Sequence, residues 1–300
     1  MNYLVADTVE QAIELLARHE GRARIIAGGT DLMQALRDGR LAAETLVDIT
    51  RIAGLDRIEV DGEWLQVGAA VTFAMLRDSP LLRERARCLS QAAACVGAAP
   101  IQAMATWVGN IVQALPSADG GVAAVALDAA ARVVDADGAG WVPVEALYRG
   151  AKTSAIDPTR QLVSHLRFPL PRPASGSAWR RIGRRPSLTL PILNCAATLR
   201  LSFPQGTIGA VSLALGPAAA LPFRARDAEA FLVGRSLDDQ VVERAAALAQ
   251  AECRVRTSPL RATREYREAM IPILVRQALG EARDQALGRR GDLGPAGGQS

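Results

Sequence analysis

The segment from Ile25 to Leu32 places the tightest limit on the fold, because a strand-like apolar run ends there in Gly28 and Gly29, just before a helix start. Consecutive glycines let the backbone turn sharply and let a ligand approach without side-chain interference. A helix N-terminus adds unpaired N–H donors and the positive end of a dipole. The segment therefore predicts an α/β arrangement with a bend that suits a phosphate. The alternative is a plain strand-to-helix turn capped by Asp31.

Patterns around this bend alternate between helix and strand. Thr8 and Gln11 form a capping box ahead of an amphipathic run, and a strand-like run at 46–49 follows the bend. Alternation of this kind is typical of α/β folds. The bend itself is neither Gly-x-Gly-x-x-Gly nor Gly-x-x-x-x-Gly-Lys-Ser/Thr, so it indicates neither a Rossmann fingerprint nor a P-loop.

The middle of the chain carries a different succession of patterns. Two hairpins are predicted at 58–68 and 132–144, each around an Asp-Gly pair. Helices are expected over 79–96, which opens with Ser-Pro, and over 117–130. The stretch 100–116 between them is rich in small residues and predicts no helix.

The last part of the chain predicts a separate unit. The segment from Pro169 to Gly183 holds several Pro and Gly residues and is the best candidate for a linker. The elements expected after it are strands at 192–202 and 207–215 and helices at 227–233, 238–251 and 258–278. The tail 288–300 is rich in Gly and polar residues, and we expect it to be disordered.

A second glycine-bearing segment, Ala105 to Ile111, also indicates close approach of the backbone to a ligand. Asn110 tolerates left-handed conformations and offers both a donor and an acceptor. Asp119 follows at a predicted helix start, where a carboxylate is favourable or can accept from a sugar hydroxyl. A structural loop with Ser117 or Asp119 as its cap is the alternative.

Composition argues against several kinds of site. With 49% apolar and 22% charged residues, the 300-residue chain is globular and long enough for two domains. Its net charge of +4, without a basic tract interleaved with aromatics, predicts no nucleic-acid binding. Two isolated histidines and four cysteines without a Cys-x-x-Cys pair predict no metal site and no iron–sulfur cluster. Lacking a secretory signal and any run of about 20 apolar residues, the chain is expected to be cytoplasmic, without a membrane span.

Two arginine-rich segments complete the set of motifs. The run from Arg180 to Arg185 is a solvated face, a set of salt-bridge partners, or a counter-charge for an anionic cofactor or a reduced flavin. The segment from Arg261 to Arg267 opens the last predicted helix, with Arg261 and Glu265 at helical spacing. It indicates packing or a subunit contact.

In this order and at these distances, the four segments resemble the FAD-binding medium subunit of molybdenum hydroxylases, the family that includes bacterial xanthine dehydrogenase and carbon monoxide dehydrogenase. Ala27 to Leu32 is similar to the family's first FAD loop, and Ala105 to Asn110 is similar to its second loop, usually Thr-Ile-Gly-Gly-Asn. The resemblance spans about residues 1–280 and is closest to the FAD-binding subunit of the bacterial xanthine dehydrogenase branch.

The resemblance implies an α/β + α+β fold. A two-subdomain FAD-binding module would occupy 1–172, divided into about 1–55 and 56–172, and a smaller α+β C-terminal domain would occupy 177–283. FAD would be the cofactor of this chain, with no catalytic side chain and no metal ligand. The residues that the resemblance assigns to FAD binding are Arg24, Ile25, Ile26, Ala27, Gly28, Gly29, Thr30, Asp31, Ala105, Thr106, Trp107, Val108, Gly109, Asn110, Asp119, Val163 and Arg180.

Several residues depart from the family pattern. Val108 replaces the first glycine of the second loop. An Ala-Met pair at 103–104 stands where Arg-Asn is common, and a Leu-Thr pair at 188–189 stands where Asp and an aliphatic residue are often found. Arg180 stands where the family usually has lysine, which keeps the charge and changes the geometry. The scattered cysteines argue against the branch that carries an extra 4Fe–4S cluster.

The resemblance implies an oxidoreductase subunit of xanthine dehydrogenase type within a heterotrimer. A large partner subunit would oxidise the substrate at a molybdenum cofactor. A small partner subunit would pass electrons through 2Fe–2S clusters to FAD, which would deliver them to NAD or another acceptor. The departures motivate an alternative, a structural or assembly subunit of such a complex without redox-active flavin.

Overall fold

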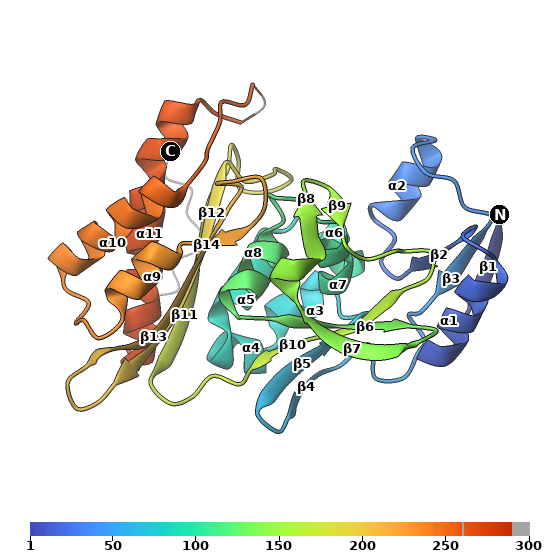
Figure 1. Ribbon diagram of the computed structural model, residues 1–300, viewed down its shortest axis with the longest axis horizontal. Coiled ribbons are helices and arrows are strands. Elements are labelled where there is room, and N and C mark those ends of the chain that lie inside the picture. The colour runs from blue at the N-terminus through green and yellow to red at the C-terminus, as the bar shows by residue number, and fades with distance from the viewer. Residues whose placement is uncertain (260, 290–300) are drawn as a thin grey trace. The chain divides into compact units, whose positions relative to one another are not determined.

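The computed structural model describes residues 1–259 and 261–289, and the chain divides into two compact units that do not follow chain order (Figure 1). Unit 1 consists of Met1–Leu76, Ala99–Ala114 and Ala129–Leu170. Unit 2 consists of Arg77–Ala98, Leu115–Asp128 and the chain from Pro171 onward. The domain boundaries implied by the resemblance stay a prediction. The expected disordered tail falls outside the described residues from position 290 onward.

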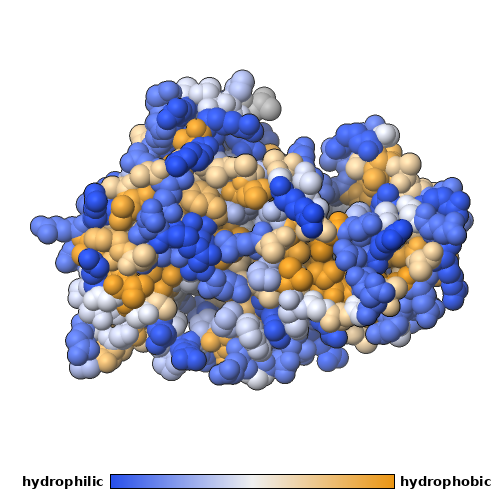
Figure 2. Space-filling view, in the orientation of Figure 1, coloured by the Kyte–Doolittle hydropathy of each residue, from blue (hydrophilic) through white to orange (hydrophobic). Residues whose placement is uncertain are grey.

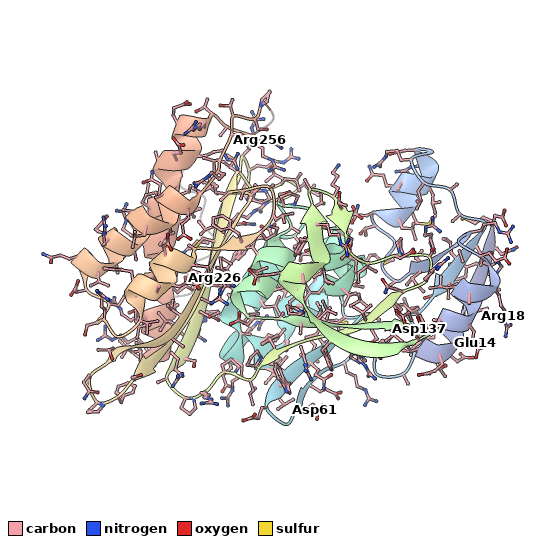
Figure 3. The ribbon with its side chains drawn as sticks, viewed as in Figure 1. Glu14, Arg18, Asp61, Asp137, Arg226 and Arg256 are labelled. Atoms are coloured by element: carbon pink, nitrogen blue, oxygen red, sulfur yellow. The ribbon has the colours of Figure 1, made fainter. Side chains whose placement is uncertain are left out.

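Unit 1 begins with a parallel sheet of strand order β1-β3-β2. Its elements are β1 (Asn2–Val5), α1 (Val9–Arg18), β2 (Ala23–Ile26), α2 (Leu32–Arg37) and β3 (Thr45–Asp48). The predicted cap of α1 is confirmed, since the Gln11 N–H donates to the Thr8 hydroxyl at 3.1 Å. Glu14 and Arg18 form an exposed ion pair one helical turn apart (Figure 3). The first glycine bend follows β2 directly.

An antiparallel sheet of order β4-β5-β10-β6-β7 forms the second half of Unit 1. Its strands are β4 (Ile58–Asp61), β5 (Trp64–Gly68), β6 (Ala130–Asp135), β7 (Gly138–Pro143) and β10 (Leu162–Pro169). Both predicted hairpins are present, with Asp61 and Asp137 at their ends (Figure 3). Leu65, Val67 and Phe168 are fully buried and build the core beneath the sheet.

Short elements connect these strands. They are α3 (Phe73–Asp78), α6 (Ala99–Met104), α7 (Trp107–Val112), η1 (Val144–Leu147), β8 (Tyr148–Gly150) and β9 (Thr153–Ser154). The prediction that 100–116 forms no helix is wrong, because α6 and α7 lie there. Tertiary packing overrides the weak local propensity: Trp107 of α7 is fully buried and packs edge-on against Phe168, with ring centres 6.2 Å apart.

Unit 2 is built on an antiparallel sheet of order β11-β12-β13-β14 with helices on both faces (Figure 1). Helices α9, α10 and α11 lie on one face, and α5 and α8 lie on the other. The elements are α4 (Pro80–Arg85), α5 (Arg87–Cys95), α8 (Asp119–Ala126), β11 (Ser175–Ile182), β12 (Leu193–Ser202), β13 (Thr207–Gly216), β14 (Phe223–Arg224), α9 (Arg226–Leu232), α10 (Asp239–Glu252) and α11 (Arg264–Ala286). Every residue of α8 is buried, so this helix requires packing partners all round, and α5 and the sheet supply them.

Several predicted boundaries in Unit 2 are wrong. The helix expected over 79–96 is broken at Ala86, which ends α4 and precedes α5. The last helix begins at Arg264 rather than at 258, because the Thr263 hydroxyl accepts the Tyr266 N–H and caps it.

The predicted linker 169–183 is also shorter, since β11 starts at Ser175. Gly176 is a packing residue of this strand. A Cβ there would lie 2.0 Å from the Ala282 carbonyl oxygen of α11, so glycine is needed for contact between strand and helix.

None of the helices in the described part of the chain is long and apolar enough to cross a membrane. Figure 2 shows hydrophilic and hydrophobic residues interspersed over the visible face of the C-terminal helices. The apolar surface of Unit 2 is instead gathered inside, where β12 and β13 pack against α11.

Candidate functional site

The first glycine bend lies in direct contact with the end of α6, which leads into the second glycine-bearing segment. A Cβ on Gly28 would lie 1.9 Å from the Met104 carbonyl oxygen and 3.0 Å from the Ala105 Cα. Main-chain atoms cannot swing aside as the end of a flexible side chain can, so only glycine permits this approach. The fold therefore brings together two segments that are far apart in the sequence, and they meet backbone to backbone at Gly28.

The turn itself is made at Gly29, whose φ of +67° favours glycine. The backbone N–H groups of residues 27–30 have no hydrogen-bond partner among the residues that the structure describes. Asp31 precedes α2, but its side chain makes no capping bond, which argues against the plain capped turn. A row of unpaired N–H groups on a glycine bend can donate to the oxygens of an anion.

The second segment combines two polar side chains with apolar side chains of the core of Unit 1. The Thr106 hydroxyl accepts the Gly109 N–H at 3.1 Å and so caps α7. The Asn110 Oδ1 is buried and has no partner in the described part of the chain. Val108, which replaces the family's glycine, is only 6% exposed and packs in the core of Unit 1, whereas Gly109 is exposed. The Val108 side chain therefore packs in the core and does not cover the exposed Gly109.

The side chains of three other expected site residues of Unit 1 contact the protein itself. Arg24 turns its guanidinium back to the carbonyl oxygens of Gly21 and Ala23, at 2.6 and 2.7 Å, and its buried Nε has no partner among the described residues. Val163 is buried on β10 opposite Val133. The Trp107 ring is part of the core, so only its backbone belongs to the loop.

A polar cluster inside Unit 2 surrounds Asp119, the first residue of α8. Asp119 is 6% exposed, and the Asn194 Nδ2 donates to its Oδ1 at 2.7 Å. The Arg181 Nε lies 3.6 Å from the same oxygen. Burial raises the pKa of Asp119 to about 6, although the charge of Arg181 and the Asn194 hydrogen bond both act to lower it. At neutral pH the carboxylate is therefore ionised and paired.

Arg181, and not its neighbour Arg180, faces this carboxylate. Successive residues of a strand point to opposite sides, and Arg180 pairs with Glu281 of α11 instead. Arg181 also donates to the carbonyl oxygens of Cys95 and Thr189, and so holds the segment after β11 in place. No local pattern indicated this arrangement, because helices cover both faces of β11 and its buried residues Ala178 and Trp179 lie on opposite sides of the strand.

The comparison with known proteins identifies the family. Residues 1–171 match the family described as the FAD binding domain in molybdopterin dehydrogenase, and residues 178–282 match the CO dehydrogenase flavoprotein C-terminal domain. The chain belongs to the molybdenum hydroxylases as an FAD-binding medium subunit. The family, fold class and cofactor expected from the resemblance are confirmed, and the chain is a subunit of an oxidoreductase.

Relatives of this subunit are similar over nearly their whole length. The putative xanthine dehydrogenase FAD-binding subunit of Escherichia coli strain K12 is 29% identical over 94% of this chain and 95% of the relative. The carbon monoxide dehydrogenase medium chain of Afipia carboxidovorans is 28% identical over 93% and 95%. A solved structure of carbon monoxide dehydrogenase from Hydrogenophaga pseudoflava, which lacks the Mo-pyranopterin moiety of its molybdenum cofactor, superposes with a TM-score of 0.87 at 26% identity, covering 95% of this chain and 98% of the matched chain.

The residues of Unit 1 fit the family's cofactor. FAD carries a diphosphate and many polar groups, and the first bend presents unpaired N–H donors beside a main-chain contact that no Cβ can enter. The Asn110 Oδ1 and the Arg24 Nε are buried polar atoms without a partner among the described residues. Buried polar atoms are normally satisfied, so these two are candidates for contacts with a polar ligand.

Proposed function

We propose that this chain is the electron-transfer subunit of a heterotrimeric molybdenum hydroxylase of the xanthine dehydrogenase type. In this proposal, FAD receives electrons from 2Fe–2S clusters of a small partner subunit and delivers them to NAD or another acceptor. A large partner subunit oxidises the substrate at a molybdenum cofactor, and the complex works in the cytoplasm. Similarity to a medium chain and to an FAD-binding subunit over more than nine-tenths of the sequence supports this role.

The backbone of the two glycine-bearing segments would hold the diphosphate of FAD. The N–H groups of residues 27–30 would donate to its oxygens, and the contact at Gly28 would fix the distance between the segments. Thr106 accepts the cap bond of α7 through its oxygen, so its own hydroxyl proton is free to donate to the cofactor. The contact between Gly28 and Met104 is the observation that carries this assignment.

We assign the remaining contacts to side chains that the resemblance names. Asn110 would bind through its buried amide, and Asp119 would accept from a hydroxyl of the cofactor as an ionised carboxylate. When bound, FAD supplies a carrier that takes up and releases electrons one or two at a time. The chain's own residues orient this carrier and need no nucleophile or general base.

The test is the flavin content and activity of the purified complex. We expect the recombinant protein, purified with its copurifying subunits, to contain about one FAD per chain and to reduce NAD or a dye when the substrate of the complex is added. A well-folded complex without flavin would overturn the proposal and favour the structural or assembly role. Mass spectrometry of the copurifying chains would show whether one of them carries two sets of 2Fe–2S cysteines.

A further inference from the structure

A cleft of about 300 Å³ opens in Unit 2 where α4, α5, the segment before β11 and the end of α11 meet. Among the described residues, its lining includes five arginines and one glutamate: Arg83, Arg85, Arg87, Arg172, Arg289 and Glu84. A concave wall concentrates the field of the like charges around it. The cleft therefore has a net positive charge and favours anions.

Neighbouring carboxylates neutralise only part of this charge. Three of the arginines form solvent-exposed ion pairs, which are Arg83–Asp78, Arg85–Glu84 and Arg289–Asp284. Exposed pairs of this kind contribute little stability, so these guanidinium groups can turn to a ligand at small cost. Arg87 and Arg172 have no carboxylate partner in the part of the chain that the structure describes.

Hydrogen bonds hold the frame of the cleft, and the Arg83 Nε also donates to the Arg77 carbonyl oxygen at 3.0 Å. The Gln285 amide donates to the Glu84 carbonyl oxygen at 2.9 Å and accepts the Ser177 N–H at 2.8 Å, which ties α11 to α4 and β11. Arg172 stands between two prolines, whose rings restrict the backbone on both sides of it. A fixed frame lowers the entropic cost of binding.

We propose that this cleft binds a small molecule that carries two or more linked phosphate groups, such as inorganic pyrophosphate or a nucleoside diphosphate. The guanidinium fork matches phosphate oxygens two at a time, and each phosphate brings more than one negative charge into a small volume. An acidic peptide spreads single charges over a longer chain and places fewer of them in 300 Å³. The cleft uses none of the residues of the two FAD loops.

Titration calorimetry with sodium pyrophosphate at low salt tests the proposal on the flavin-loaded protein with its copurifying subunits. We expect saturable binding to one site per chain, weakening as salt rises. The double variant Arg87→Glu/Arg172→Glu should weaken binding by more than about tenfold. The matched control, Arg149→Glu/Arg244→Glu, makes the same charge change at two exposed arginines of β8 and α10 and should bind as the wild type does.

The same experiment contains the results that would overturn the proposal. Equal affinity in the cleft variant and the control would place the site elsewhere. Tighter binding of a hexaglutamate peptide than of pyrophosphate would identify an acidic polypeptide as the occupant. Should the charge reversal impair folding, Arg87→Gln/Arg172→Gln must show the same loss. The absorbance of bound flavin, measured on every sample, separates failure of this cleft from failure of the FAD site.

Discussion

The contact between Gly28 and Met104 provides the sharpest test of how this chain holds its flavin. In Gly28→Ala, the added Cβ would lie 1.9 Å from the Met104 carbonyl oxygen. To reach an ordinary contact distance of 3.4 Å, the two atoms must move about 1.5 Å further apart. The displaced atoms belong to the backbone that leads into the second loop. The variant therefore changes the spacing of the two loops without removing any polar group.

The expected cost follows from known effects of overpacking. Inserting a methyl group into a close-packed site costs roughly 1–3 kcal/mol, and we expect the upper end because main-chain atoms must move. Gly39→Ala is the control for the steric contact, since no atom lies within 4 Å of the added Cβ. Gly39 also has the same φ of +67° as Gly29, so it matches the backbone strain of Gly29→Ala. It should cost only about 1 kcal/mol, the strain of a left-handed alanine. Gly29→Ala should fall between them, because its Cβ meets the flexible end of Ile26 at 3.1 Å.

The assay combines urea unfolding with the absorbance of bound flavin in the same samples. Gly28→Ala should lose both stability and most of its FAD, and Gly39→Ala should keep its FAD despite the strained turn. Retention of full flavin content by Gly28→Ala would refute the idea that close contact of the two loops is required for binding. Equal flavin loss in Gly28→Ala and Gly39→Ala would refute it as well, because the control leaves the contact untouched.

Three further predictions concern single side chains. Burial raises the pKa of Asp119 from 3.8 to about 6 on folding. The wild type should therefore lose up to about 3 kcal/mol of unfolding free energy relative to Asp119→Asn as the pH rises from about 4 to about 6. Urea titrations across this pH range test this prediction, and a difference between the two proteins that does not change with pH would contradict it. In the same titrations at pH 7, Arg181→Met should lower the free energy of unfolding by about 3 kcal/mol and Arg180→Met by less than about 1 kcal/mol. Equal losses would contradict the assignment of Arg181, and not Arg180, as the partner of Asp119. Val108→Gly should keep its FAD and lose about 2 kcal/mol of unfolding free energy, because a core side chain is deleted; loss of flavin would show that Val108 contacts the cofactor.

Elements specified by neighbouring residues were predictable from the sequence. The capping box of Thr8 and Gln11 and the two Asp-Gly hairpins depend on contacts a few residues apart, and all of them are present. Helix α7 and the start of β11 depend on distant partners. The Thr106 cap of α7 is a local signal, but the burial of Trp107 against Phe168 and the approach of Gly176 to the backbone of α11 depend on residues far away in the sequence.

The glycine bends were predictable for a related reason. A glycine pair between a strand and a helix marks a place where a side chain would obstruct something, and Gly28 is such a place. The sequence could not show whether the obstructed partner is a ligand or the chain itself. The structure shows that Gly28 contacts the backbone near Met104, whereas Gly29 supplies the turn. Contact and turn are thus divided between two adjacent glycines.

The pair Arg180-Arg181 shows how one strand gives two identical side chains different roles. Alternation on β11 directs Arg180 to Glu281, in a pair whose side chains are 37% and 16% exposed, and directs Arg181 to Asp119, in a pair whose side chains are each 7% exposed. Water screens the first pair, so its loss costs little, whereas the second pair compensates a charge that burial alone would neutralise. Asp119 stays ionised at neutral pH because Arg181 and Asn194 together hold its pKa near 6, against the upward effect of burial. In the proposed site, the negative charge that Asp119 would offer to a hydroxyl of the cofactor therefore depends on Arg181.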